Sequence, residues 1–180
     1  MNLRVKQKLF PLSLGFFILL LDQITKFYIV KNWPSGTMIA DVFNNDILHI
    51  YHVRNKVIAF SLGQEIPENF RPLLFIVLPL CVLAFLLYYF FKSPECTQFQ
   101  RWAIAGITGG GLGNLIDRMF RPEGVVDFIS VKFFGIFGFE RWPTFNISDA
   151  AVVVGVILWL ISMFADEKSK FADEKSKVKK

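Results

Sequence analysis

Long apolar stretches alternate with shorter polar segments along the whole chain. Each apolar stretch has about the 20 residues that a helix needs to cross the hydrocarbon core of a bilayer. We therefore predict an all-α membrane protein with four transmembrane helices. The expected spans cover about residues 10–30, 70–91, 99–120 and 147–164, the middle two forming a hairpin.

The two polar connections at residues 31–69 and 121–146 carry patterns of their own. Runs of strand-forming residues at 47–53 and 57–62 predict a small sheet or hairpin that rests on the membrane. In the second connection, glycines interrupt the aromatic segment Phe133–Phe139. We expect this segment to be a loop that dips into the membrane interface.

Composition and charge support a membrane location. Hydrophobic residues make up 53% of the chain, more than a soluble domain needs, and 21 residues are Phe. Much of the net charge of +5 comes from basic residues near the two ends, which favours a membrane surface over nucleic acid. The positive-inside tendency places both ends in the cytoplasm. We expect one membrane-embedded domain, residues 1–164, and a charged cytoplasmic tail, residues 165–180.

Several charged residues lie inside or at the edge of the expected spans, where they are costly. Asp22 and Lys26 are four positions apart, so they form either an ion pair on one helix face or part of a functional site. Asp117 and Arg118 end the third span, where they are either interface anchors or functional groups.

Two further carboxylates flank the second connection and suggest chemistry. Asp127 lies within an apolar run, where desolvation should raise its pKa. Asp149 follows Asn146 by three residues at the start of the fourth span. It is therefore either a helix-capping residue or a functional carboxylate whose ionised form the helix start stabilises. One protonated and one ionised carboxylate are what aspartic peptide hydrolysis requires, and the connection returns both to the same membrane face.

Other motifs give no support for a metal or cofactor. His49 and His52 lack the third ligand and the spacing of a zinc site. The glycines between Gly106 and Gly113 are not followed by the Lys-Ser/Thr of a phosphate-binding loop, and their spacing instead favours close helix packing. We expect no cofactor.

Three blocks of sequence resemble the lipoprotein signal peptidase (signal peptidase II) family over nearly the whole chain. They are Gly113-Asn-Leu-Ile-Asp-Arg118, Gly124-Val-Val-Asp-Phe128 and Phe145-Asn-Ile-Ser-Asp149. The Asp22-x-x-x-Lys26 pair is similar to the first-helix motif of the family. Arg54-Asn55 with Ala59-Phe60 is similar to its outward-loop motif, although Val57 and Ile58 replace a glycine and a small residue.

The resemblance implies a metal-free aspartic endopeptidase of the bacterial inner membrane, with its active site at the periplasmic face. Such enzymes cleave prolipoproteins on the N-terminal side of a diacylglyceryl-modified cysteine; membrane lipids are further partners and nucleic acid is not. The implied fold is a four-helix bundle with a small periplasmic sheet. Asp127 and Asp149 match the catalytic pair, and the supporting polar positions are Asp22, Lys26, Asn55, Asn114, Asp117, Arg118 and Asn146.

Two other classes remain open from the residues alone. A small transporter or proton-conducting protein would use the charges of the first and third spans as a relay. However, the chain lacks the paired broken helices that are common in transporters. An intramembrane protease of the Gly-x-Gly-Asp type fits less well, because Asn114 follows Gly111-Leu-Gly113 where the acid is required.

Overall fold

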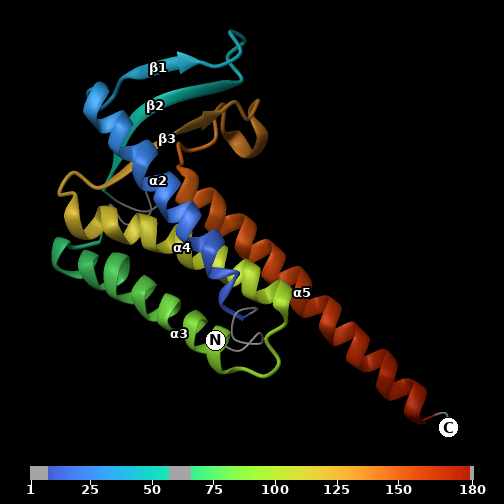
Figure 1. Ribbon diagram of the computed structural model, residues 1–180. Helices are drawn as coiled ribbons and strands as arrows, with labels where there is room; N and C mark the ends of the chain where they lie inside the picture. The colour runs from blue at the N-terminus through green and yellow to red at the C-terminus, as the bar shows by residue number, and fades with distance from the viewer. Residues whose placement is uncertain (1–7, 57–65, 179–180) are drawn as a thin grey trace.

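The computed structural model describes residues 8–56 and 66–178, with side chains described as far as residue 165. Long helices form most of the protein, and a three-stranded sheet lies at one end of them (Figure 1). The helices are α2 (Leu12–Asn32), α3 (Leu78–Lys92), α4 (Gln98–Phe120) and α5 (Ile147–Val178). The strands are β1 (Met38–Asp41), β2 (Leu48–Asn55) and β3 (Val125–Val131).

Three of the helical segments in the described part of the chain are long and apolar enough to cross a membrane. They are Leu12–Asn32, Glu68–Lys92 and Ile147–Ala165. Helix α4 has 23 residues, which at about 1.5 Å per residue also suffices in length, but it is less apolar. It packs against the other three helices, and much of its surface is buried. The predicted span at 99–120, and with it the count of four spans, therefore stays a prediction.

Close packing of α2 on α4 depends on glycine, as the sequence suggested. A Cβ atom at Gly109 would lie only 2.7 Å from the Gly15 Cα atom, so only glycine lets the two backbones meet. A Cβ atom at Gly113 would overlap the side chains of Ser148 and Asp22. The predicted role of these glycines in helix packing is confirmed.

The second predicted span is confirmed as the candidate span Glu68–Lys92, which is not an α-helix throughout. It begins with a 3₁₀ turn, η2 (Glu68–Phe70), followed by a π-helical segment, η3 (Leu73–Val77), before α3. Pro79 lies in the first turn of α3 and has no N–H group to donate to the preceding turn. A wider π turn before a proline accommodates its ring.

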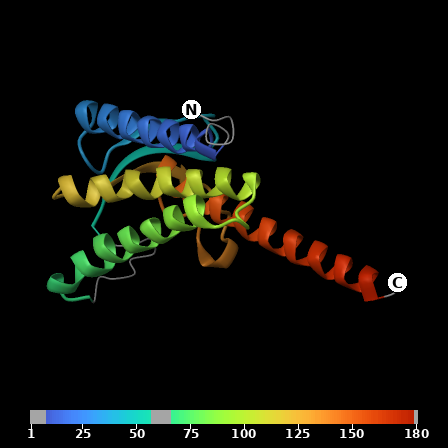
Figure 2. The same cartoon turned by 60° about the horizontal axis from the view of Figure 1, so that its bottom comes forward.

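Helix α5 continues well past residue 164, where the fourth span was expected to end. Its C-terminal part extends away from the other helices (Figure 2). The repeated Ala-Asp-Glu-Lys-Ser-Lys sequence is rich in good helix formers, which explains why the helix does not stop at the end of its apolar part.

The sheet joins the two polar connections, in the antiparallel order β1-β2-β3. The predicted strand at 47–53 is confirmed as β2, whereas the predicted strand at 57–62 lies outside the described residues. The small sheet predicted in the first connection is confirmed by the pairing of β1 with β2, whereas its third strand, β3, comes from the second connection and was not predicted. The pairing sets Asp127 opposite Val53, so the candidate catalytic residue lies on a rigid strand.

The aromatic segment between β3 and α5 forms a short hairpin closed by a bridge between Lys132 and Arg141. Phe134 and Phe137 are exposed and both have positive φ angles, near 54° and 53°. The predicted glycine-interrupted loop is confirmed in shape. Its contact with the membrane interface stays a prediction.

Candidate active site

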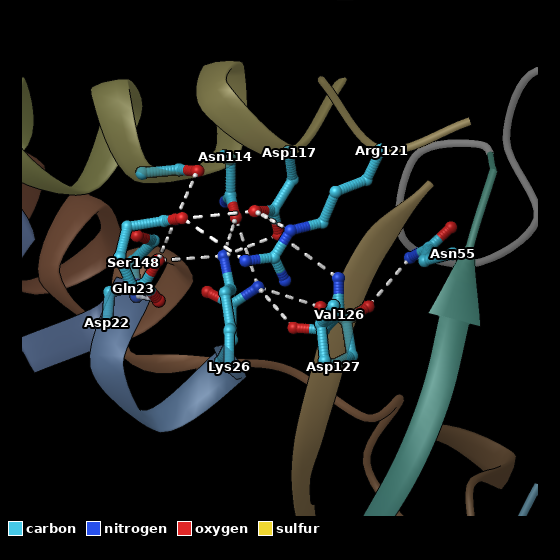
Figure 3. A network of polar contacts seen from close by, with 12 residues as sticks. Asp22, Gln23, Lys26, Asn55, Asn114, Asp117, Arg121, Val126, Asp127 and Ser148 are labelled. Atoms are coloured by element: carbon cyan, nitrogen blue, oxygen red, sulfur yellow. Dashed lines mark hydrogen bonds and ion pairs between the residues drawn. The ribbon is translucent and has the colours of Figure 1, made fainter. Parts of the chain in front are cut away.

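A fully buried lysine organises the centre of the molecule (Figure 3). Lys26 Nζ lies 2.8 Å from Asp22 Oδ2 and 3.0 Å from Asp117 Oδ2, and it donates to Asn114 Oδ1 over 3.0 Å. The ion pair expected between Asp22 and Lys26 is confirmed. Asp117 is not the interface anchor considered for it, because it is completely buried beside the same lysine.

The two carboxylates of this group also bind the backbone of neighbouring elements. Asp22 Oδ1 accepts from the Ser148 N–H at the start of α5 over 3.0 Å. Asp117 Oδ2 accepts from the Val126 N–H on β3 over 3.1 Å. Each of these backbone groups immediately precedes one of the two candidate catalytic residues. The buried ion group therefore fixes the positions of Asp127 and Asp149.

Asn146 connects the two candidate carboxylates directly. Its Nδ2 donates to Asp127 Oδ1 over 2.8 Å and to Asn114 Oδ1 over 3.0 Å. Its backbone N–H donates to Asp149 Oδ2 over 3.1 Å. The structure thus brings together Asp127, from β3, and Asp149, from the first turn of α5.

Asp149 is also a helix-capping residue, the first of the two interpretations left open above. Its N–H donates to Asn146 Oδ1 over 2.9 Å. Together with the bond from the Asn146 N–H to Asp149 Oδ2, this forms a reciprocal capping box at the start of α5. Its other oxygen, Oδ1, accepts from Asn114 Nδ2 over 2.7 Å. Capping therefore orients the carboxylate and does not exclude a chemical role.

Asp127 is only 2% exposed, and both of its carboxylate oxygens accept hydrogen bonds. Asn55 Nδ2 donates to Oδ2 over 3.0 Å, and Asn146 donates to Oδ1. Burial, followed by the negative charge of Asp149, raises the pKa of Asp127 to about 7, while the two amide donors partly oppose the rise. Asp127 can therefore carry a proton at neutral pH.

Arg118 lies at the edge of this group. Its guanidinium stands 5.1 Å from the centre of the Phe75 ring, and it is close enough to Asp127 and Asp149 for their charges to act on it. It lines a cavity of about 340 Å³ between the start of the second span and the end of α4. The cavity walls include the basic residues Lys56, Arg71, Arg118 and Arg121 and the apolar residues Phe75 and Ile76.

Two residues of the network were not predicted from the sequence. Gln23 Nε2 donates to the Gly113 carbonyl over 3.1 Å and lies within 3.3 Å of both buried carboxylates. Arg121 Nε lies 3.4 Å from Asp117 Oδ1. A glutamine inside an apolar span next to Asp22 was the available signal for Gln23.

The two histidines lie in the sheet, away from this network. His52 Nδ1 is 2.7 Å from the Trp33 carbonyl, and His49 Nε2 is 3.1 Å from Asp46 Oδ1. Both side chains are buried and have polar partners, as expected for structural histidines. Among the described residues, no three His, Cys, Asp or Glu side chains are grouped as a metal site would require.

The chemistry available to this site is acid–base catalysis by two carboxylates. One is deeply buried and able to hold a proton near neutral pH, while the other is partly exposed and accepts two N–H groups. A shared asparagine holds both in place. Such a pair can activate a water molecule and polarise a carbonyl at the same time.

Comparison with known proteins points the same way. The family model for signal peptidase (SPase) II matches residues 14–165. A lipoprotein signal peptidase of Treponema pallidum (strain Nichols) is 43% identical over 163 residues, which cover 91% of this chain and 87% of the relative. Another, from Borrelia hermsii (strain HS1 / DAH), is 45% identical over 155 residues, covering 86% of this chain and 89% of the relative.

Two solved structures share the fold, each described as a bacterial membrane enzyme. The structure at 2.3 Å resolution gives a TM-score of 0.74 at 30% identity and covers 89% of this chain and 90% of its own. The structure at 1.9 Å resolution gives a TM-score of 0.70 at 29% identity, covering 85% and 91%.

Proposed function

The chain belongs to the signal peptidase II family, and from that premise we propose an aspartic mechanism that uses Asp127 and Asp149. The substrate is a prolipoprotein whose cysteine carries a diacylglyceryl group, and the cleaved bond lies on the N-terminal side of that cysteine. The observation that carries the proposal is the bridge formed by Asn146, which binds both carboxylates. No other described pair of carboxylates combines this contact with a member whose pKa is raised to about 7.

The two aspartates take different roles in the proposed reaction. Asp149 is ionised and removes a proton from the attacking water, while the protonated Asp127 gives its proton to the scissile carbonyl oxygen, so that a tetrahedral gem-diol forms. Asp149 then gives the proton it took from water to the leaving nitrogen, Asp127 takes back one hydroxyl proton, and the peptide bond breaks to give the amine and the carboxyl product. Because the two groups are coupled, the pair titrates as a unit and shares a single proton during the cycle.

The remaining predicted residues support this pair. Asn55 and Asn146 orient Asp127, and Asn114 orients Asp149. Arg118 lines the adjoining cavity, where it can bind substrate backbone. The buried ion group holds the start of α5 and β3 in place, which gives Asp22, Lys26 and Asp117 a positioning role.

We further propose that α4 also crosses the membrane, so that there are four spans and they form one membrane-embedded domain over residues 1–164. Both ends of the chain then lie in the cytoplasm, and the sheet and the site lie at the periplasmic face of the bacterial inner membrane. What supports this arrangement is that the sheet lies at one end of the helices, near the end of α2 and the start of α5 (Figure 1). Membrane lipids surround the spans, and nucleic acid is not a partner.

Cleavage of a purified substrate tests the function. The protein in nanodiscs should remove the signal peptide from a diacylglyceryl-modified prolipoprotein, and mass spectrometry should place the new N-terminus at the modified cysteine. A precursor with an unmodified cysteine should be cleaved far more slowly. Activity should persist in a metal chelator. Loss of cleavage on chelation, or a different cleavage position, would contradict the proposal.

The pH dependence of cleavage should reflect the raised pKa of Asp127. The reaction requires its protonated form, so kcat/KM should fall as pH rises through about 7 and then drop about tenfold per pH unit. The Asn55→Ala variant removes a hydrogen bond that lowers the pKa of Asp127, so its falling limb should move to higher pH. A rate that stays constant from pH 6 to 9 would show that Asp127 is not the acid.

A further inference from the structure

A second cavity, of about 320 Å³, lies on the flank of the molecule between the end of α2 and the end of α4. It is distinct from the cavity beside Arg118, although Arg121 contributes to both. Its residues combine two arginines and one glutamate with apolar side chains. They are Phe27, Val30, Arg54, Phe120, Arg121, Pro122 and Glu123.

Both arginines line this cavity with side chains that are largely buried. The side chains of Arg54 and Arg121 are only 13% and 22% exposed. Within residues 8–56 and 66–165, Arg54 Nε and Arg121 Nη1 have no hydrogen-bond acceptor. A buried N–H without an acceptor is costly, so these two atoms are suited to an anionic ligand.

The apolar walls place the cavity at the edge of a membrane. Phe27 and Phe120 are largely exposed, and Phe27 belongs to the last turns of the candidate span Leu12–Asn32. Tyr28 and Trp33 pack edge to face, with ring centres 5.5 Å apart, near the end of the same helix. Aromatic residues of this kind mark the level of lipid headgroups.

We propose that this cavity binds the headgroup phosphate of an anionic phospholipid, with Arg54 and Arg121 as the ligands. The acyl chains would lie along the exposed faces of Phe27, Val30 and Phe120. Guanidinium groups match the geometry of phosphate oxygens, and their weak hydration favours binding at a membrane interface. The diacylglyceryl group of the proposed substrate bears no phosphate, so the proposed phosphate site is separate from the site that holds that group.

Glu123 is the natural competitor of such a lipid. Its carboxylate lies 3.3 Å from Arg54 Nη2, but its side chain is 69% exposed, so the pair is a weak surface ion pair. A phosphate can displace it at small cost. Arg121 also contacts Asp117 and Gln23, so a bound lipid would stabilise the arginine that reaches the buried ion group.

Native mass spectrometry of the full chain in detergent tests the proposal, with dilauroyl phosphatidylglycerol and dilauroyl phosphatidylcholine as probes. Both lipids carry the phosphate, but the quaternary ammonium of phosphatidylcholine brings a positive charge close to the two arginines, so phosphatidylglycerol should bind about tenfold more tightly. Arg54→Gln and Arg121→Gln should each remove most of this preference, because they weaken phosphatidylglycerol binding more than phosphatidylcholine binding. Glu123→Gln should tighten phosphatidylglycerol binding severalfold, an effect that a misfolded variant cannot produce.

Arg71→Gln is the matched control. Arg71 lines the cavity beside Arg118 and not the proposed lipid site, and its replacement lowers the net charge by the same amount as Arg54→Gln or Arg121→Gln. It should leave the lipid preference intact. Equal binding of the two lipids by the wild type, or an unchanged preference in both Arg54→Gln and Arg121→Gln, would overturn the proposal. Inorganic phosphate that competes as strongly as the lipid would also overturn it, since the ligand would then be a soluble anion. None of these outcomes depends on the proposed cleavage activity.

Discussion

Asp127→Asn and Asp149→Asn are each expected to lower the rate of signal-peptide removal by about a thousandfold or more, within the range that general acid–base catalysis supplies. An asparagine at position 127 cannot donate a carboxylic acid proton to the scissile carbonyl. An asparagine at position 149 cannot take a proton from water. Single-turnover cleavage of a diacylglyceryl-modified prolipoprotein, followed by mass spectrometry, measures both effects on the chemical step.

Both substitutions keep the volume of the side chain, so folding should be little affected. Asp41→Asn is the matched control, because Asp41 lies on β1, the strand farthest from β3 in the sheet. It should cleave at nearly the wild-type rate. The double variant should be no slower than the slower single variant, since residues that act as a unit are not additive. A folded Asp127→Asn or Asp149→Asn variant that retains a tenth of the activity or more would remove the pair as the catalytic dyad.

The parts of this structure that local sequence patterns determine could be predicted. Apolar runs of about 20 residues identified the helices, and the spacing of four between Asp22 and Lys26 identified their ion pair. The capping box at Asn146 and Asp149 was visible in the same way, because both residues lie within one helical turn.

Contacts between distant segments could not be predicted in the same way. The pairing of β3 with β2 brings Asn55 within 3.0 Å of Asp127, although the two are 72 positions apart. No local periodicity encodes that pairing. The family resemblance named these residues as part of one site, but it did not say which atoms meet. The sequence did not indicate that the arginines of the flanking cavity lie together: Arg54 was noted only as part of the outward-loop motif, and Arg121 only as a basic residue near a helix end, where such residues are common.

The charges of the first and third spans have an explanation other than an ion relay. Lys26 binds Asp22, Asp117 and Asn114, and both carboxylates also accept backbone N–H groups. This closed group connects α2, α4, the start of α5 and β3. A relay for protons or ions needs a path through the membrane. These contacts instead explain the buried charges of Asp22, Lys26 and Asp117 by their role in holding the segments that carry Asp127 and Asp149. Family membership favours the same conclusion.

Lys26→Met is the second substitution for which we expect a large effect, here on both folding and cleavage. It removes the only cation that contacts Asp22 among the described residues, and it leaves two completely buried carboxylates with fewer partners. Breaking a buried ion pair by removing one partner costs about 3–5 kcal/mol. Asn114 also loses a donor to its Oδ1, so its hold on Asp149 weakens. Chemical denaturation in detergent should show the loss of stability, and kcat should fall more than KM rises.

A second substitution should partly rescue this variant and so separate charge from packing. In Lys26→Met/Asp22→Asn one carboxylate is neutral, while Asp117 keeps Arg121 at 3.4 Å and the new amide oxygen can still accept from the Ser148 N–H. The coupling energy between the two positions should be about 1–3 kcal/mol, the range found for residues that share one buried network. Asp22→Asn alone should destabilise the protein, because it removes a charge that Lys26 needs. If the double variant is as unstable as the sum of the two single variants, the ion group does not act as a unit, and its proposed role in positioning Asp127 and Asp149 is wrong.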